Sequence, residues 1–219
     1  MAVAALVATA TLLGGHARSE RKRWPATSAF VFLPNPETAR LLVVGYNELG
    51  ADLAWAGTTT YAGAAMADKS DSRQLGTLLE LTNALDPYFH TPFRWGAYSL
   101  SAFAEPRPDE KQSGTWASIR VLKRALETFP NDWEFAWMLG LRYYLGTKSD
   151  DPAKERAYRE LGVSWIEKAI HMPHSRSDLR TLAVSLRTRL GQLDVARELL
   201  YELIPLTTDP YTRQQLEDK

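Results

Sequence analysis

The chain has 219 residues, with 26 Lys or Arg balanced by 26 Asp or Glu, so its formal net charge at pH 7 is zero. A balanced charge gives no general electrostatic attraction for nucleic acid, and we expect no nucleic-acid partner. Cysteine is absent, which excludes disulfides, thiolate metal ligands and a cysteine nucleophile. A chain of this length can form one domain or stack about four or five helical hairpins.

The N-terminal end of the chain differs from the rest. Residues 2–14 are apolar and uncharged, and they are followed by a basic cluster made of Arg18, Arg21, Lys22 and Arg23. This apolar stretch is shorter than the roughly 20 residues that span a bilayer. Its length is typical of the core of a secretory signal, and Gly15 and Ala17 are small residues at the positions that a signal peptidase reads.

We therefore predict that residues 1–17 are a signal peptide or a membrane-anchor segment, and that residues 18–34 are a basic, extended linker. After an anchor, the basic cluster would fix its orientation or contact anionic lipid head groups. A buried or frayed N-terminal helix is the alternative. A signal or an anchor implies the cell envelope, with the protein in the periplasm or attached to the inner membrane.

Helices begin after this linker. Asn35 is a capping residue, Pro36 suits the first helical position, and Glu37 adds negative charge to the first turn, where the helix dipole favours it. A break near Gly45 to Gly50 divides the following stretch into two helices. Leucines at helical spacing predict a further helix over 73–85.

The rest of the chain predicts alternating helices and turns. We expect helices over 88–103, 114–128, 132–145, 152–171, 177–190, 192–204 and 209–217. Two polar, proline-bearing loops lie at 104–114 and 146–154. Each loop stands between the first and the second helix of a two-helix unit.

Prolines punctuate this pattern at a fixed interval. Pro87, Pro130 and Pro173 stand 43 residues apart, each after a short apolar run, and Pro210 follows a fourth run. A period of this size in a helical chain is typical of stacked helix-hairpin repeats. Without its polar loop of about nine residues, each unit shortens to about 34 residues, the length of a tetratricopeptide repeat.

The segment Ser177–Pro210 has 34 residues without an insertion and resembles a tetratricopeptide repeat in "LGQLDVA". The matching positions are the turn glycine, the small residue where the helices cross and the large apolar residue beyond, namely Gly191, Ala196 and Leu200. A small residue is needed there because it lets two helices approach closely. This unit departs from the family at Val184, where a glycine is usual, and at Arg187, where an aromatic residue is usual.

Three more segments resemble the same repeat. Trp133–Pro173 carries the first-helix motif in "AWMLGLRYYL", with Leu139, Gly140 and Tyr143, and its second helix has Ala169 at the small position. Phe89–Pro130 and a degenerate unit from about Asp52 to Pro87 complete the set. The resemblance implies that residues 35–219 are a tetratricopeptide-like repeat domain, an all-α, right-handed superhelix of about four degenerate hairpins.

The block "LPNPETARLLVVGYNELGADLAWAGTTTYAG" is also similar to the opening of bacterial envelope proteins that combine an N-terminal hydrophobic segment with such repeats. This similarity bears on location. It implies no particular activity.

In the repeat family, the first helix of each hairpin lines a concave face that holds the partner. Carried over to this chain, that face presents Asp52, Trp55, Thr59, Arg94, Tyr98, Glu134, Trp137, Leu141, Tyr144, Asp178, Thr181 and Ser185. Trp, Tyr and Arg dominate interface energetics. The alternative is that these aromatic residues pack between hairpins.

A clamp for a partner's terminal carboxylate, known in the family, needs several Lys, Arg and Asn on this face. Arg94 alone is suitably placed. We therefore expect an extended or helical partner segment held by aromatic and apolar contacts.

The sequence gives little support for catalysis. His171 and His174 would share a helical face, but Pro173 between them ends the helix, so we expect no metal site and a helix-end role for the histidines. Asp150-Asp151 and Asp109-Glu110 lie in polar loops, where solvated charge is the ordinary role. Phosphate-binding, serine-elbow and dinucleotide motifs are absent from the sequence.

The expected protein is thus no enzyme, and it takes no cofactor, metal or small-molecule substrate. Its expected function is a protein-binding scaffold or an assembly subunit of a membrane-associated complex. The alternative is a structural subunit of an oligomeric envelope complex, held by its convex surface and loops without a peptide groove. An enzyme would need a buried polar pocket, for which the sequence has no signal.

Overall fold

A computed structural model describes residues 34–68, 74–102 and 114–219 of the chain. Within these ranges the chain forms ten α-helices, one π-helical turn and no strand. The predicted all-α class is therefore confirmed for this part of the chain. The predicted segment 1–17 and nearly all of the linker 18–34 lie outside the described residues. No helix in the described ranges combines the length and the apolar character needed to cross a membrane.

The chain divides into two compact units, with the boundary between Leu85 and Asp86. The first unit contains α2 (Pro36–Leu42), α3 (Asn47–Asp68) and α4 (Leu75–Leu85). The helices α3 and α4 pack as a hairpin, and α2 also contacts α4. As predicted, the Asn35 side chain caps α2 by accepting the Thr38 backbone N–H at 2.8 Å. Buried leucines of α4 and small residues of α3 form the core: Ala51, Ala62, Ala65, Leu75, Leu78, Leu79 and Leu85.

The break between α2 and α3 falls at residues 43–46, slightly before the predicted position. Val44 has φ of 50° and Gly45 has φ of 88°. Left-handed backbone suits glycine but strains a β-branched residue. Val43 lies over Gly50, where an added Cβ would come within 2.5 Å of the Val43 side chain. A tight, strained corner thus joins the two helices.

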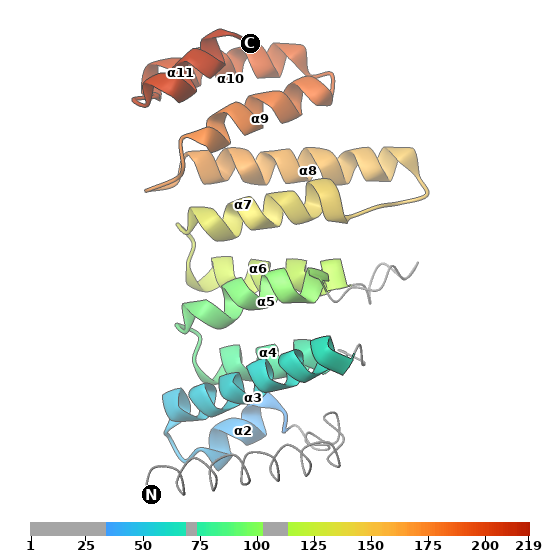
Figure 1. The fold of residues 1–219 in the computed structure, drawn as a ribbon, viewed down its shortest axis with the longest axis vertical. Coiled ribbons are helices and arrows are strands. Elements are labelled where there is room, and N and C mark those ends of the chain that lie inside the picture. The colour runs from blue at the N-terminus through green and yellow to red at the C-terminus, as the bar shows by residue number, and fades with distance from the viewer. Residues whose placement is uncertain (1–33, 69–73, 103–113) are drawn as a thin grey trace, which may run out of the picture. The chain divides into compact units, whose positions relative to one another are not determined.

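The second unit stacks its helices in chain order (Figure 1). Its helices are α5 (His90–Ala102), α6 (Gly114–Thr128), α7 (Trp133–Leu141), α8 (Pro152–Ile170), α9 (Asp178–Arg189), α10 (Leu193–Leu206) and α11 (Pro210–Glu217), with the π-helical turn η2 (Arg142–Gly146) after α7. The pairs α5–α6, α7–α8 and α9–α10 pack as hairpins, and α6–α7 and α8–α9 contacts join them. These bounds agree closely with the predicted helices.

Aspartate caps and prolines set the starts of several helices. Asp132, Asp151 and Asp209 each accept backbone N–H groups of the helix that follows, and Pro152 and Pro210 open α8 and α11. Gly191 has φ of 75° in the turn between α9 and α10, as the repeat resemblance implied. The proline-containing turns therefore separate real hairpins in this unit.

Glycines bring α7 and α8 close together. A Cβ added to Gly140 would lie 2.6 Å from Ile166 Cγ1 and 2.7 Å from the Gly162 carbonyl oxygen. A Cβ added to Gly162 would lie 2.7 Å from both the Gly140 carbonyl oxygen and the Tyr144 backbone nitrogen. The motif glycine Gly140 was predicted, whereas Gly162 on the second helix was not. Ala169, which the sequence placed at the small position, is fully buried in the same helix.

Arginines of one helix bind the carboxyl-terminal carbonyls of another. In the first unit, Arg40 of α2 donates to the Ala84 carbonyl at the end of α4, at 3.2 and 2.7 Å. In the second unit, Arg156 of α8 reaches the Leu190 carbonyl after α9 at 3.3 Å, and Arg180 of α9 reaches the Leu206 carbonyl of α10 at 2.9 Å. The last carbonyls of a helix lack partners within it, so these guanidinium groups satisfy them and oppose the helix dipole.

Candidate functional site

The structure brings predicted residues of α5 and α7 together. Arg94 of α5 forms an ion pair with Glu134 of α7, with Nη1 and Oε2 3.4 Å apart. Further along the two helices, Tyr98, one turn after Arg94, and Trp137 and Leu141, one and two turns after Glu134, line a single cavity of about 300 Å³. Five of the predicted partner-binding residues therefore lie on neighbouring first helices of two successive hairpins.

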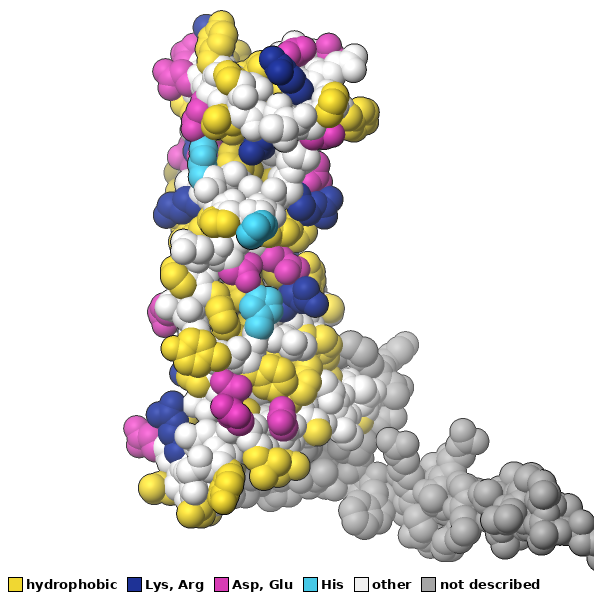
Figure 2. Space-filling model, turned by 90° about the vertical axis from the view of Figure 1, so that its left-hand side faces the viewer, with side chains coloured by type: hydrophobic (Ala, Val, Ile, Leu, Met, Phe, Trp, Pro, Cys, Tyr) yellow, Lys and Arg dark blue, Asp and Glu magenta, His cyan; other side chains and the backbone are white. Residues whose placement is uncertain are grey.

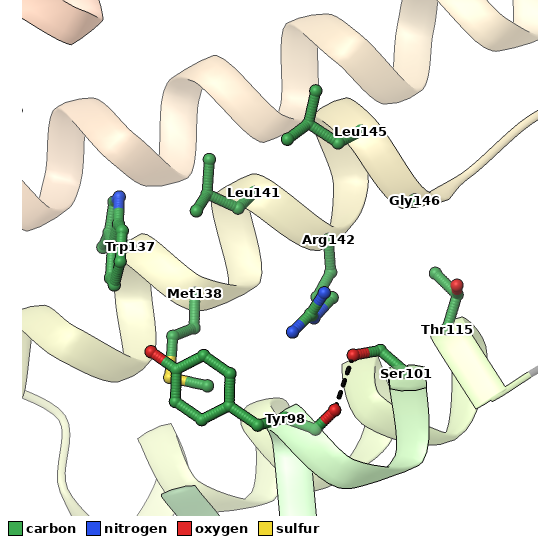
Figure 3. Close-up of a pocket in the computed structure, with 9 residues that line it drawn as sticks. All are labelled: Tyr98, Ser101, Thr115, Trp137, Met138, Leu141, Arg142, Leu145 and Gly146. Carbon is green, nitrogen blue, oxygen red and sulfur yellow. Dashed lines mark hydrogen bonds between the residues drawn. The ribbon is translucent and has the colours of Figure 1, made fainter. Parts of the chain in front are cut away.

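Six more residues complete the cavity (Figure 3). They come from α5, α6, α7 and η2, and they are Ser101, Thr115, Met138, Arg142, Leu145 and Gly146. Tyr98 and Leu145 are the large side chains of its lining that are most exposed, with 46% and 66% of their surface accessible. Most of the wall is apolar or aromatic, and the polar groups gather at one end.

The π-helical turn shapes that polar end. Thr147 Oγ1 donates to the Tyr143 carbonyl at 2.5 Å, and the Thr147 N–H donates to the Arg142 carbonyl at 3.1 Å, which closes the turn. Gly146 then passes close to α6, because an added Cβ would lie 2.9 Å from Thr115 Cγ2. π-helical turns are rare and occur frequently at functional sites. Here the turn holds Leu145 and Gly146 over the cavity.

Arg142 is the charged residue of the cavity. Figure 3 shows its guanidinium reaching from the π-helical turn toward Tyr98 and Ser101 of α5. Its Nη2 donates to the Ala97 carbonyl at the long distance of 3.5 Å, and its buried Nε has no hydrogen-bond partner among the described residues. Burial lowers the pKa of Arg142, and the nearby Tyr98 acts in the opposite direction.

The hydroxyl groups beside Arg142 are only partly used. Ser101 Oγ donates to the Tyr98 carbonyl at 2.7 Å, which leaves its lone pairs directed to other donors. Thr115 presents a second hydroxyl from α6. The polar end can therefore donate through the guanidinium while the hydroxyl groups donate or accept.

The sequence did not predict Arg142, Ser101 and Thr115 as site residues. The predicted face followed positions 134, 137, 141 and 144, whereas Arg142, one position after Leu141, begins η2 and reaches toward α5. A signal was present, because Arg142 is the single charged residue in the apolar run "AWMLGLRYYL". A lone arginine in such a run is a reason to look for a buried partner.

The other predicted residues of the second unit are placed differently. Tyr144, like Trp137 and Leu141, packs against the apolar cluster of α8 to α11. Trp137 Nε1 and Thr181 Oγ1 are buried without hydrogen-bond partners among the described residues. Asp178 is exposed and forms a bidentate ion pair with Arg176, at 3.0 and 2.7 Å.

Ser185 of α9 hydrogen-bonds with two neighbours. It donates to the Thr181 carbonyl and accepts from Lys219 Nζ, each at 2.8 Å. The predicted residues Asp52, Trp55 and Thr59 lie on α3 of the first unit, where Asp52 is exposed and Thr59 Oγ1 donates to the Trp55 carbonyl at 3.2 Å. The cavity is therefore built from α5 to η2 alone.

Of the two histidines predicted at helix ends, His171 occupies one, whereas His174 lies in the turn between α8 and α9 with φ of 58°. His171 is the carboxyl-terminal cap residue of α8, with Pro173 in the turn that follows, and its Nε2 lies 3.7 Å from Glu202 Oε1. His90 begins α5, and its Nε2 lies 2.7 Å from Asp132 Oδ2. Within the described ranges, no group of three His, Cys, Asp or Glu side chains could hold a metal ion.

Comparison with models of protein families, with curated proteins and with solved structures gave no significant match for this chain.

Proposed function

We propose that this chain is a non-enzymatic, protein-binding module of tetratricopeptide-like hairpins that takes a partner segment on the face formed by α5 and α7. The observation that carries the proposal is the cavity between successive first helices, bordered by Tyr98, Trp137 and Leu141. An exposed tyrosine beside partly buried apolar residues offers a large contact area at a small entropic cost.

Three features support the repeat assignment. The hairpins α5–α6 and α7–α8 match the 43-residue proline period. Gly191 and the buried Ala196 stand at the turn and crossing positions of the family pattern. Gly140 fills the first-helix glycine position at the close approach of α7 and α8. In this proposal the hairpins continue as a right-handed superhelix, with residues 1–17 exporting the module or attaching it to the membrane.

Peptide display against the full chain tests the proposal. A random 12-residue library should yield binders, and replacing Tyr98 by Ala should weaken them at least tenfold, because central aromatic contacts contribute most of the binding energy. Tyr98 is well exposed, so this change leaves the core intact. Tyr201→Ala on α10 is the matched control, because Tyr201 is 74% exposed and lies outside the cavity.

Two outcomes of the display experiment would contradict the proposal. A library that gives no binder, or binders that tolerate Tyr98→Ala and a second cavity change, Leu145→Ser, as well as they tolerate Tyr201→Ala, would contradict a binding face on α5 and α7.

A second candidate function is a structural subunit of an oligomer, and the corner between α2 and α3 favours it. Large apolar side chains project there with more than half of their surface exposed: Leu41, Leu42, Val44, Tyr46, Leu49 and Leu53. Figure 2 shows hydrophobic side chains beside acidic ones in the lower part of the view, where α2 and α3 lie. Exposed apolar patches commonly mark association surfaces.

Light scattering on the full chain tests this second function. An oligomer that dissociates when Leu41 and Val44 are changed to Ser, but persists in Tyr98→Ala, would support association through the corner. A monomer at all concentrations would contradict it.

A further inference from the structure

We infer that the cavity at Arg142 receives a carboxylate of the partner segment, beside an apolar side chain of the same segment. This inference deepens the proposed function and rests on it. It concerns the chemistry of the partner at one position, whereas the proposed function concerns only the binding face.

The Arg142 guanidinium has no counter-ion among the described residues. Arg142 projects into the cavity, its Nε is buried without a partner among the described residues, and its one hydrogen bond there is the long contact to the Ala97 carbonyl. No carboxylate in the described ranges lies within 4.0 Å of it, whereas the largely buried Arg187 forms an ion pair with Glu167. A partly desolvated charge without a counter-ion is unfavourable unless a ligand pairs with it.

A carboxylate is the counter-ion that best fits this guanidinium. A guanidinium matches a carboxylate with two parallel hydrogen bonds, and this geometry is both strong and specific. Of the described residues that line the cavity, Arg142 alone is charged. One positive charge balances one carboxylate, while a phosphate group with nearly two negative charges would need a further cation. Ser101 and Thr115 add neutral hydroxyl groups beside the guanidinium.

An apolar wall lies beside the guanidinium. Tyr98, Met138, Leu141 and Leu145 border the space next to Arg142. A volume of about 300 Å³ accommodates one apolar side chain together with a carboxylate, and it is at the lower limit for small-molecule pockets. The cavity therefore fits an acidic group and a neighbouring apolar residue of a polypeptide better than an independent ligand.

This site differs from the carboxylate clamp considered from the sequence. The clamp uses several Lys, Arg and Asn residues on the outward positions of the first helices. Arg142 instead begins the π-helical turn η2 and reaches toward α5, where its Nη2 donates to the Ala97 carbonyl. Arg94, the residue that the sequence suggested for a clamp, is already paired with Glu134.

Three matched dipeptides test the inference by NMR on the full chain. They are acetyl-Phe-Gln with a free carboxylate, acetyl-Phe-Glu amide with a side-chain carboxylate, and acetyl-Phe-Gln amide with neither. At least one acidic probe should bind with a dissociation constant on the order of 1 mM, as expected for a fragment of this size. It should move the Nε–Hε signal of Arg142, which is assigned by its absence in Arg142→Gln. The neutral probe should bind at least tenfold more weakly.

The comparison of the two acidic probes identifies the source of the carboxylate. A preference for acetyl-Phe-Gln indicates a chain terminus, and a preference for acetyl-Phe-Glu amide indicates an internal Asp or Glu. Arg142→Gln should remove the discrimination against the neutral probe, and Arg142→Lys should retain part of it because the charge remains. Arg197→Gln, which changes an exposed arginine of α10 outside the cavity, should leave it unchanged.

Several results would overturn the inference: equal binding of the neutral probe, an unmoved Arg142 signal with both acidic probes at 20 mM or roughly twentyfold the expected dissociation constant, or discrimination that survives Arg142→Gln. If Arg142→Gln does not fold, the wild-type signal and Arg142→Lys decide. Display-selected peptides that need Tyr98 but contain no acidic group would refute the carboxylate site and leave the proposed function standing. If display selects no peptide but an acidic probe still moves the Arg142 signal, the carboxylate site would stand and the proposed function would be contradicted.

Discussion

The close approach of α7 and α8 makes Gly140→Ala a sharp test of the second unit. The added methyl would lie 2.6 Å from Ile166 Cγ1, 2.7 Å from the Gly162 carbonyl oxygen and 3.1 Å from the Ile166 backbone nitrogen. Two of these atoms belong to the backbone of α8, so a rotamer change cannot relieve the contact. The helices must separate by several tenths of an ångström.

The expected magnitude follows from two opposing effects. Overpacking a tight helix contact costs about 1–3 kcal/mol, whereas replacing Gly by Ala inside a helix favours folding by about 1 kcal/mol. Contacts with two backbone atoms of α8 place the overpacking cost in the upper part of its range, about 2–3 kcal/mol. We therefore expect a net loss of about 1–2 kcal/mol in the free energy of unfolding, or a melting temperature roughly 2–8 °C lower for a chain of this size.

Urea and thermal unfolding followed by circular dichroism measure this change. Gly63→Ala on α3 is the matched control, because an added Cβ there meets nothing within 4 Å. This control should be more stable than the parent by about 0.5–1 kcal/mol. If Gly140→Ala were as stable as the parent while Gly63→Ala showed its gain, the packing of α7 on α8 described above would be refuted.

Three further changes probe other contacts. Glu167→Gln on α8 should lower the free energy of unfolding by about 1–3 kcal/mol in urea titrations, because Arg187 of α9 donates to both Glu167 oxygens at 2.6 and 2.5 Å and would lose its counter-ion. An unchanged midpoint would contradict this. Val44→Gly should raise the melting temperature, because the β-branched Val44 has φ of 50° and the strain of this left-handed backbone costs about 1 kcal/mol. A lower melting temperature would count against backbone strain there. The hydrogen bond from the Thr212 side chain, followed by that from its backbone N–H, lowers the pKa of Asp209 below its ordinary value of 3.8. A carboxylate with a lowered pKa stabilises the folded state above that ordinary value and loses this effect as the pH falls through the lowered pKa. The difference in free energy of unfolding between the wild type and Asp209→Asn should therefore shrink below about pH 4. A difference that stays constant from about pH 6 to about pH 2.5 would exclude this charged cap.

Local sequence signals were enough to place the helices. Asp132, Asp151 and Asp209 precede helices that they cap, and Pro152 and Pro210 fix first turns, so the predicted starts agree with the structure. These contacts join residues two or three positions apart, which is why a single sequence reveals them. The same holds for Gly191, whose left-handed conformation is a property of the turn itself.

The cavity depends on contacts that a helical repeat pattern does not encode. Tyr98, Trp137 and Leu141 were predicted because they follow the spacing of the first helices. Arg142 was missed because its role arises from the carbonyl of Ala97, 45 residues earlier, and from the π-helical turn that it begins. Gly162 was missed for a similar reason: only glycine fits there because Gly140 of α7 and Tyr144 of η2 leave no room for a Cβ.

The arginines at helix ends have a consequence for how the hairpins melt. When the last turn of α10 frays, Arg180 of α9 loses its bond to the Leu206 carbonyl, and fraying after α9 likewise deprives Arg156 of α8. Fraying of one helix end therefore also removes a hydrogen bond that holds the preceding helix. In a linear array such nearest-neighbour coupling raises cooperativity, so α8, α9 and α10 should unfold in one step.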